Sequence, residues 1–363
     1  MRTFNLKFSG DYLNEKGEVA TGYFGEDIFA KAPFIKHEFL LDQSPVTQGA
    51  AFWDKLYSLK MEPKHIAEAN GLVVIRPYIK SSTFAEGAKN LVAIGRAGVG
   101  TDKIDMDACT ENDVAVFNAP ESLTHSTASA AMLFIIALAK RLPAQERMAR
   151  SGCWSDQANI TGDDLVGQTL GVVGLGRISR ELIRLLAPFK MRVLAVDIYP
   201  CTPEEAAKLN ITFAPDLDTL LRESDYVSMH CTLNDSTRGM IGEREFRLMK
   251  PTAYFINAGR GELVKQDALV RALTEQWIAG AGLDVFAEEP LPLNNPLTKL
   301  DNVILSPHWL PTTHRAVQIV STAMAEGMVK AAQGKVPDNV VNRAVLERPG
   351  FKKKLAMFAE NTM

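Results

Sequence analysis

The sequence contains few of the features that mark secreted, metal-binding or nucleic-acid-binding proteins. Only four of its 363 residues are cysteines, and no Cys-x-x-Cys or Cys/His spacing joins them. Disulfides and a zinc site are therefore not expected, no metal is predicted, and a reducing cytoplasm is the expected location. Lys and Arg do not exceed Asp and Glu, since the net charge is −3. The composition therefore predicts no nucleic-acid partner.

Long apolar runs are missing as well. The N-terminal residues hold no apolar segment of the signal-peptide type. The longest apolar stretch, residues 128–139, is interrupted by Ser129 and is too short to cross a bilayer. We therefore expect a buried helix there and predict no membrane partner. The chain is long for one domain, so two domains are expected.

Strand-like and helix-like segments alternate along the chain in two series, which indicates an α/β fold with parallel sheets. In the first series, strands are expected at residues 2–8, 37–41, 72–77, 91–97 and 114–118, and helices at 45–59 and 105–112. A long helix is expected over 126–151. In the second series, strands are expected at 170–174, 192–197, 211–214, 226–230, 253–257, 279–284 and 303–306, and helices at 178–190, 266–276 and 313–333.

A glycine-rich turn opens the second series. Gly174 and Gly176 lie between an expected strand and an expected helix, where a tight turn and a helix N-terminus can receive a pyrophosphate. The third glycine of the dinucleotide motif is replaced by Ser179, which is small enough to be tolerated. Asp197 follows about 20 residues later, where an acid binds the adenosine ribose. It would repel a 2′-phosphate, and no Lys or Arg follows in residues 198–200, so NAD is predicted. By itself, Asp197 would be better explained as the cap of a strand end, and it indicates NAD only in combination with the glycines and the strand order.

These patterns together predict two domains. We expect a Rossmann-type doubly wound NAD domain at residues 121–311. A smaller flavodoxin-like α/β substrate domain is expected at residues 1–120 and 312–363, with a cleft between the two domains. The tail from Arg348 carries Lys352, Lys353 and Lys354, and it is expected to be solvated.

Three functional side chains follow expected strands of the second series. Arg260, Glu289 and His308 each come shortly after a buried strand. Ligands bind outside the carboxyl ends of strands in such sheets. A cation, a carboxylate and an imidazole at that edge suit an enzyme that moves a hydride to or from a 2-oxo or 2-hydroxy acid. A buried structural Arg–Glu pair is the alternative, and Glu288 could replace Glu289 as the operative acid.

Four longer motifs, at residues 95–105, 257–261, 282–290 and 302–308, occur in the order of one known family. Residues 90–310 resemble the D-isomer-specific 2-hydroxyacid dehydrogenases, which include hydroxypyruvate reductases and 3-phosphoglycerate dehydrogenases. The first eighty residues match only in their strand–helix pattern. The resemblance implies an NAD-dependent enzyme that acts on small 2-oxo and 2-hydroxy acids. It also implies a homodimer formed through the NAD domain and its long first helix.

The resemblance also implies a role for individual residues. His308 would be the general acid and base, Glu289 its partner, and Arg260 the clamp for the substrate carboxylate and carbonyl. The amides of Val99 and Gly100 would bind the substrate carboxylate. The implied cofactor-binding residues are Gly174, Gly176, Arg177, Ile178, Asp197, His230, Thr232, Asn257, Ala258 and Asp284, of which Asp284 would meet the nicotinamide carboxamide.

Some positions depart from the family or leave alternatives open. Ser129 replaces a common Glu on the long helix, and Trp309 stands where small residues are usual. Arg76 and Lys80 could meet a substrate phosphate or simply face solvent. We expect His125 and His314 to be helix or cap residues. Formate dehydrogenases carry Gln at the position of Glu289, which argues against them, whereas NAD-sensing corepressors of the same family remain an alternative.

Overall fold

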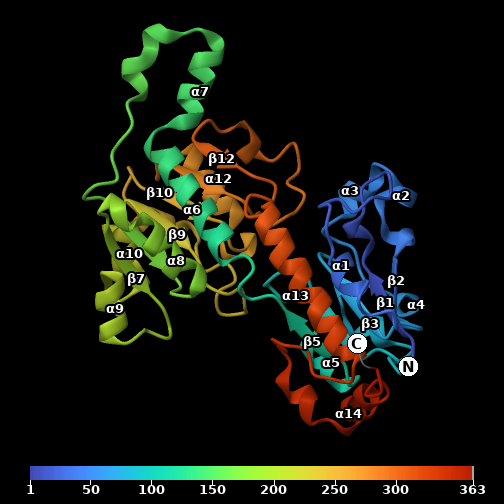
Figure 1. The fold of residues 1–363 in the computed structure, drawn as a ribbon. Coiled ribbons are helices and arrows are strands. Elements are labelled where there is room, and N and C mark those ends of the chain that lie inside the picture. Colours follow the sequence, from blue (N-terminus) through green and yellow to red (C-terminus); the bar gives the residue numbers. More distant parts are fainter. Residues whose placement is uncertain (362–363) are drawn as a thin grey trace. The chain divides into compact units, whose positions relative to one another are not determined.

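The computed structural model describes residues 1–361 and divides the chain into two compact units (Figure 1). Unit 1 combines Met1–Leu123 with the chain from Thr312 onward, and unit 2 is Thr124–Pro311. Each unit is built around one parallel sheet, which confirms the predicted α/β fold class.

The sheet of unit 1 has the strand order β2-β1-β3-β4-β5, and all its pairs are parallel. This is the flavodoxin-like order. The strands are β1 (Phe4–Phe8), β2 (Ile35–Phe39), β3 (Gly71–Val74), β4 (Ala93–Arg96) and β5 (Ala115–Asn118). The α-helices are α1 (Glu26–Phe29), α2 (Pro45–Gln48), α3 (Ala51–Lys55), α4 (Pro63–Ile66), α5 (Met106–Glu111), α13 (His314–Ala332) and α14 (Pro349–Ala356). The 3-10 turns are η1 (Gly10–Tyr12), η2 (Leu41–Gln43), η3 (Ser81–Phe84) and η8 (Arg343–Glu347).

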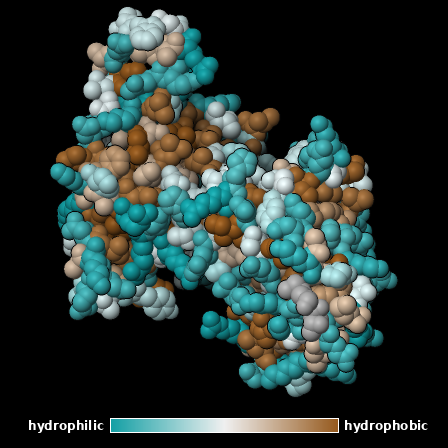
Figure 2. Space-filling view, viewed as in Figure 1, coloured by the Kyte–Doolittle hydropathy of each residue, from teal (hydrophilic) through white to brown (hydrophobic). Residues whose placement is uncertain are grey.

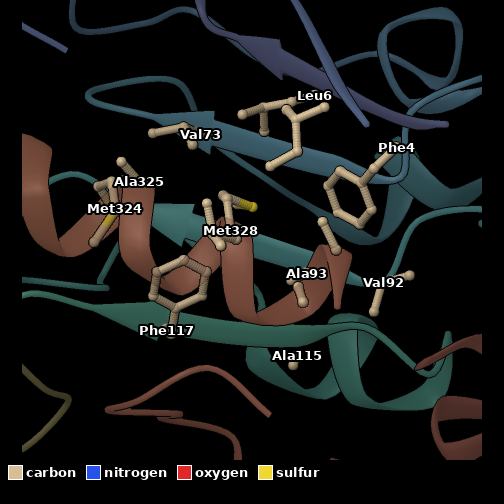
Figure 3. Close-up of a cluster of buried hydrophobic side chains, with 14 of the residues drawn as sticks. Phe4, Leu6, Val73, Val92, Ala93, Ala115, Phe117, Met324, Ala325 and Met328 are labelled. Carbon is tan, nitrogen blue, oxygen red and sulfur yellow. The ribbon is translucent and has the colours of Figure 1, made fainter. Parts of the chain in front are cut away.

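Helix α13 covers one face of this sheet. Its Met324, Ala325 and Met328 point toward Leu6, Val73, Ala93 and Phe117, which come from four different strands (Figure 3). These side chains are buried almost completely. Burial of such apolar area is the main favourable term in folding. Helix α13 therefore belongs to unit 1 although it follows unit 2 in the sequence.

The C-terminal tail is packed against unit 1, so the prediction of a solvated end was wrong. The Val341 amide donates to the Val116 carbonyl, and Asn342 Oδ1 accepts from the Val116 amide. This contact covers the outer edge of β5, where unpaired backbone groups would otherwise be exposed. Lys354 Nζ donates to the Asn112 and Asp113 carbonyls. Phe358 packs edge-on against Phe4 at 5.0 Å between ring centroids.

The sheet of unit 2 has the order β12-β11-β10-β9-β6-β7-β8, again with parallel pairs. Counted from β6, this is the doubly wound Rossmann order extended by one strand. The strands are β6 (Thr169–Val173), β7 (Arg192–Val196), β8 (Ile211–Phe213), β9 (Tyr226–Met229), β10 (Tyr254–Asn257), β11 (Gly280–Leu283) and β12 (Val303–Leu305). The α-helices are α6 (Thr124–Ala139), α7 (Leu142–Ser151), α8 (Arg177–Leu186), α9 (Pro203–Leu209), α10 (Leu217–Glu223), α11 (Glu243–Leu248) and α12 (Gln266–Thr274). The 3-10 turns are η4 (Trp154–Ile160), η5 (Ala187–Phe189), η6 (Gly261–Leu263) and η7 (Pro296–Lys299).

Two predicted helices are broken in the structure. The helix expected over 126–151 is interrupted between α6 and α7, where Arg141 adopts the left-handed conformation with φ 49° and Pro143 follows. The segment 45–59 breaks between α2 and α3 at Gly49 with φ 56°. In both cases apolar periodicity continues across a backbone turn. Among residues 1–361, no single helix is long and apolar enough to cross a membrane, and α6 with α7 passes that test only as a bent pair.

Candidate active site

Arg260, Glu289 and His308 lie at the carboxyl ends of three adjacent strands of unit 2. Arg260 follows β10, Glu289 follows β11 and His308 follows β12. Strand β11 pairs with β10, where Gly280 lies opposite Tyr254, and with β12, where Ala281 lies opposite Val303. Parallel pairing therefore delivers the three loops to one edge of the sheet, the edge that binds ligands in this architecture.

Glu289 and His308 are bonded to each other. His308 Nδ1 lies 2.9 Å from Glu289 Oε2 and 3.0 Å from Oε1. Glu289 Oε1 also accepts from the Phe286 amide at 3.1 Å, which orients the carboxylate. Glu288 is exposed, so the alternative that Glu288 is the operative acid is not supported. The bond directs the Nδ1 proton to Glu289.

The backbone of His308 is strained. It has φ 53°, in the left-handed region that few residues other than Gly, Asn and Asp enter readily. The buried Asp284 holds this loop, because its Oδ1 accepts from the Trp309 and Leu310 amides at 3.1 Å each. Strain maintained by surrounding bonds is common where a side chain must be aimed for function.

Asp284 also offers an acceptor to a ligand. Its Oδ2 is buried and bonds no atom within residues 1–361. Burial raises the pKa of the Asp284 carboxyl. An unsatisfied buried oxygen is costly, and a donor such as the carboxamide of a nicotinamide would satisfy it. This orphaned oxygen fits the NAD cofactor at this edge.

The turn that carries Arg260 is braced by Asn257. Asn257 Nδ2 donates to the Arg260 carbonyl at 2.9 Å, and its Oδ1 accepts from the Gly259 amide at 3.1 Å. Arg260 Nη1 donates to the Gly259 carbonyl at 2.8 Å. Both ends of the Asn257 side chain are thus engaged within the turn, and Ala258 lies half-buried between them. Asn257 therefore positions Arg260 by fixing the turn that carries it.

The glycine-rich turn has the geometry of a pyrophosphate site. Gly174 has φ 95°, and a side chain there would press on the Cys231 backbone. A Cβ on Gly176 would meet open space, and no side chain of the described residues caps the N-terminus of α8, where Arg177 and Ile178 begin the helix. Ser179 is fully buried, as expected for the third motif position. Free amides and the helix dipole can receive phosphate oxygens there.

Asp197 ends β7 beside this turn. Its Oδ2 accepts from the Leu175 amide at 2.5 Å and its Oδ1 from the Tyr199 amide at 2.7 Å. The carboxylate is half-buried and is therefore held in place, with lone pairs left for ribose hydroxyls. Asp197 thus caps the end of β7, and this role is compatible with the predicted binding of a ribose by the same carboxylate.

His230 and Thr232 follow β9 on the other side of the turn. His230 Nε2 lies 2.8 Å from Ser228 Oγ, and burial lowers the pKa of His230 to about 4. Thr232 is exposed. The His230 ring is therefore neutral at physiological pH and presents an uncharged face.

The depressed pKa of His230 predicts a stability change in acid. The pKa in the folded protein lies below the ordinary value of 6.5, so the unfolded chain binds more protons in this window and stability falls as pH drops from about 6.5 toward 4. We expect His230→Gln to flatten this part of the profile of urea midpoints against pH. Parallel profiles for the two proteins would show that the ring does not contribute.

Unit 1 contains the loop that the resemblance assigns to the substrate carboxylate. Gly98 has φ 139°, and a side chain there would collide with the Arg96 guanidinium. The Ala119 amide donates to the Gly98 carbonyl at 3.0 Å, and Asn118 Nδ2 donates to the Val99 carbonyl at 2.7 Å. Within residues 1–361, no acceptor occupies the amides of Val99 or Gly100. Sequence analysis missed Asn118, although an Asn at a strand end is a visible signal.

Arg76 and Lys80 have different environments. Arg76 Nη1 lies 3.4 Å from Oδ2 of Asp11, whose side chain is fully buried, and the Arg76 guanidinium lies over the Tyr57 ring. Lys80 is exposed, with its ammonium over Tyr78. Arg76 is therefore not a solvent-facing loop charge. His125 and His314 lie in the first turns of α6 and α13, as predicted.

Comparison with known proteins identifies one family. A sequence model of the NAD-binding domain of D-isomer-specific 2-hydroxyacid dehydrogenases matches residues 132–309. A glyoxylate reductase of Korarchaeum cryptofilum is 37% identical over 300 residues, which cover 81% of this chain and 90% of that protein. The chain belongs to this family. It is an NAD-dependent oxidoreductase of 2-hydroxy acids.

Other relatives of this dehydrogenase carry different names. A D-3-phosphoglycerate dehydrogenase of Methanocaldococcus jannaschii is 37% identical over 298 residues, which cover 81% of this chain but only 56% of that protein. Among solved structures, the TT0316 protein from Thermus thermophilus aligns with a TM-score of 0.77 and 27% identity. That alignment covers 93% of this dehydrogenase and all of the other chain.

Proposed function

We propose that this dehydrogenase reduces a 2-oxo acid to the D-2-hydroxy acid and catalyses the reverse oxidation, with His308 as general acid and base. The observation that carries the proposal is the bonded Glu289–His308 pair, which shares the ligand-binding edge of an NAD-binding sheet with Arg260. The names of the enzymes most like it, glyoxylate reductase and D-3-phosphoglycerate dehydrogenase, support this class of substrate. No comparable observation favours a sensor or corepressor.

NADH held by the turn with Gly174 and Gly176 and by Asp284 would supply a hydride to C2 of the oxo acid. As the carbonyl carbon accepts it, His308 Nε2 gives its proton to the carbonyl oxygen, and the hydroxy acid results. Glu289 bonds Nδ1 at 2.9 Å and stabilises the imidazolium before the transfer. In the oxidative direction, neutral His308 takes the hydroxyl proton. A positioned acid of this kind contributes roughly 10²–10⁴-fold to the rate.

The substrate and cofactor contacts complete the proposal. Arg260 would bind the carboxylate and polarise the carbonyl, because a guanidinium offers two parallel donors. The Val99 and Gly100 amides would bind the carboxylate as well. Closure of the two predicted domains over the substrate stays a prediction. The cofactor contacts would come from the turn with Gly174, Gly176, Arg177 and Ile178, and from Asp197, His230, Thr232, Asn257, Ala258 and Asp284.

One assay tests this proposal. NADH consumption is measured with glyoxylate, hydroxypyruvate, pyruvate, longer 2-oxo acids and 3-phosphohydroxypyruvate, and it is repeated with NADPH. We expect turnover of at least one acid with NADH preferred, because Asp197 would repel a 2′-phosphate. Tight NADH binding without turnover of any acid would refute the proposal.

We also propose a homodimer formed through unit 2. Helix α7 and turn η4 bury none of their residues, and apolar side chains gather around α6 below the projecting α7 (Figure 1, Figure 2). Leu133 on α6 is 49% exposed and Trp154 in η4 is 62% exposed. Apolar surface of this kind is typical of an interface. The cytoplasmic location stays a prediction.

The dimer is tested by one substitution and a matched control. Leu133→Glu should shift the protein from dimer to monomer in sedimentation velocity, because it places a charge in a desolvated interface. Leu293→Glu changes a residue that is 92% exposed elsewhere in unit 2 and should leave the dimer intact. A monomeric parent protein at micromolar concentration would contradict the proposal.

A further inference from the structure

The loop that follows β4 in unit 1 has three successive carbonyls that each accept a hydrogen bond. Residues 97–100 are called the carboxylate loop below, because the amides of Val99 and Gly100 would bind the substrate carboxylate. The donors to the carbonyls of residues 97, 98 and 99 are, in order, Arg96 Nη1 at 2.6 Å, the Ala119 amide at 3.0 Å and Asn118 Nδ2 at 2.7 Å. The direction of each of these carbonyls is therefore fixed.

A fixed carbonyl also fixes the amide that follows it. The peptide unit is planar, and in its trans form the C=O and the N–H point in opposite directions. The peptide bonds that join residues 98, 99 and 100 are trans. Through the Gly98 carbonyl, the Ala119 amide therefore sets the direction of the Val99 N–H. Through the Val99 carbonyl, Asn118 sets the direction of the Gly100 N–H, which points away from the Asn118 side chain.

These two N–H groups can be reached by a small anion. Val99 and Gly100 are half-buried, whereas the preceding Gly98 is buried. Amide donors bind a carboxylate well when they are aimed at it in advance, and a misplacement of about 1 Å can lower a rate on the order of 10²-fold. The bonds to the carbonyls of the loop therefore bear on substrate binding, although none of them involves the substrate.

Asn118 supports the loop with its side chain from the end of the neighbouring strand. Strand β5 pairs with β4 in register up to Asn118, which lies opposite Arg96. The Asn118 side chain is thus delivered to the edge of the sheet at which the carboxylate loop begins. Asn257, at the end of β10 in unit 2, uses Nδ2 in the same way on the Arg260 carbonyl. In each unit, an asparagine at a strand end braces a group that is proposed to bind the carboxylate.

We propose that Asn118 is a positioning residue for the substrate, because its side-chain amide turns the Val99–Gly100 peptide so that the Gly100 N–H faces the carboxylate. This inference rests on the proposed function. The charge of the carboxylate does not change during hydride transfer, so its contact with the loop is the same in the substrate complex and in the transition state. Loss of the Asn118 bond should therefore raise KM and leave kcat nearly unchanged.

Two substitutions of Asn118 test this role. Asn118→Ala removes the donor, and Asn118→Leu removes it while filling a similar space, so an effect common to both does not come from a cavity. The probe is oxamate, an anionic analogue of a 2-oxo acid, titrated into the NADH-loaded protein. We expect both variants to raise the dissociation constant of oxamate and the KM for the best oxo acid ~10-fold or more, with kcat changed less than about threefold.

Asn70 offers a matched control at the opposite edge of the same sheet. It lies just before β3, and its Nδ2 donates to the Asn90 carbonyl at 3.1 Å. Its Oδ1 accepts from the Asn5 amide at 2.8 Å. Asn70→Ala should therefore lower the thermal midpoint but leave KM and the affinity for oxamate as in the parent. This control separates a general loosening of unit 1 from a loss of aim in the carboxylate loop.

Hydrogen exchange measured by mass spectrometry reads the loop directly. Oxamate should slow the exchange of a peptide that contains Val99 and Gly100 in the parent, and this protection should be lost in Asn118→Ala. NADH affinity should stay unchanged in the Asn118 variants, since the proposed cofactor turn with Gly174 belongs to unit 2. Together with the thermal midpoint, NADH affinity shows whether each variant is folded.

The outcomes separate this inference from the proposed function. Parental oxamate affinity in a folded Asn118 variant, or an equal loss of affinity in Asn70→Ala, would overturn the positioning role. If the parent reduces no oxo acid, the proposed function fails, and oxamate binding and hydrogen exchange still decide about Asn118. A parent that binds oxamate without protecting the loop, or that does not bind oxamate, overturns the inference.

Discussion

Replacing His308 with Asn should lower kcat/KM by about 10³-fold while leaving the protein at least as stable as the parent. Asn cannot hold and release the proton that the imidazole transfers. It does, however, adopt the left-handed conformation more readily than His, and His308 has φ 53°. The value of kcat/KM should therefore fall, while the free energy of unfolding stays the same or rises. NADH oxidation with the best oxo acid measures the first, and urea unfolding measures the second.

The neighbouring acids provide the control for this result. Glu289 Oε2 lies 2.9 Å from His308 Nδ1, whereas Glu288 is exposed. We expect Glu289→Gln to lower kcat strongly and to change the pH profile, and Glu288→Gln to behave like the parent. A His308→Asn protein with normal turnover, or one that fails to bind NADH, would remove His308 from its proposed role.

The regular parts of the fold could be predicted from the sequence because local signals agree with the final structure. Each of the seven strands of unit 2 is a short run rich in apolar residues, and β6, β7, β10 and β11 end at or just before a Gly, Asp or Asn. The helices between the strands indicate that the strands are parallel. The site residues could be found for the same reason. Arg260, Glu289 and His308 each follow such a run, and parallel pairing brings the ends of neighbouring strands together.

The details that depend on distant contacts could not be predicted. The break at Arg141 is a local exception, because Pro143 two residues later is a visible signal of a helix boundary that periodicity alone overlooks. Lys354 belongs to a basic run that resembles a solvated end, but tertiary packing brings its ammonium to the Asn112 and Asp113 carbonyls.

Replacing Arg260 with Lys should lower kcat/KM by about 10²-fold or more, although the positive charge remains. A guanidinium can bond a carboxylate and a carbonyl oxygen through parallel donors, whereas an ammonium is a single point of charge. The turn would survive, because Asn257 bonds the Arg260 carbonyl and the Gly259 amide and neither bond uses the Arg260 side chain. The loss should therefore appear in KM and kcat together, with NADH affinity and thermal midpoint unchanged.

A second arginine provides a control for this prediction, and chemical rescue with guanidinium tests it independently. Arg192 is an exposed arginine at the start of β7, paired with Glu223 at 2.8 Å, and Arg192→Lys should leave the kinetics unchanged. Added guanidinium at millimolar concentration should restore part of the activity of Arg260→Ala but not of Arg260→Lys, whose side chain still fills the site. Full activity in Arg260→Lys would mean that charge alone suffices. The carboxylate would then be held mainly by other donors, for which the unoccupied Val99 and Gly100 amides are the candidates.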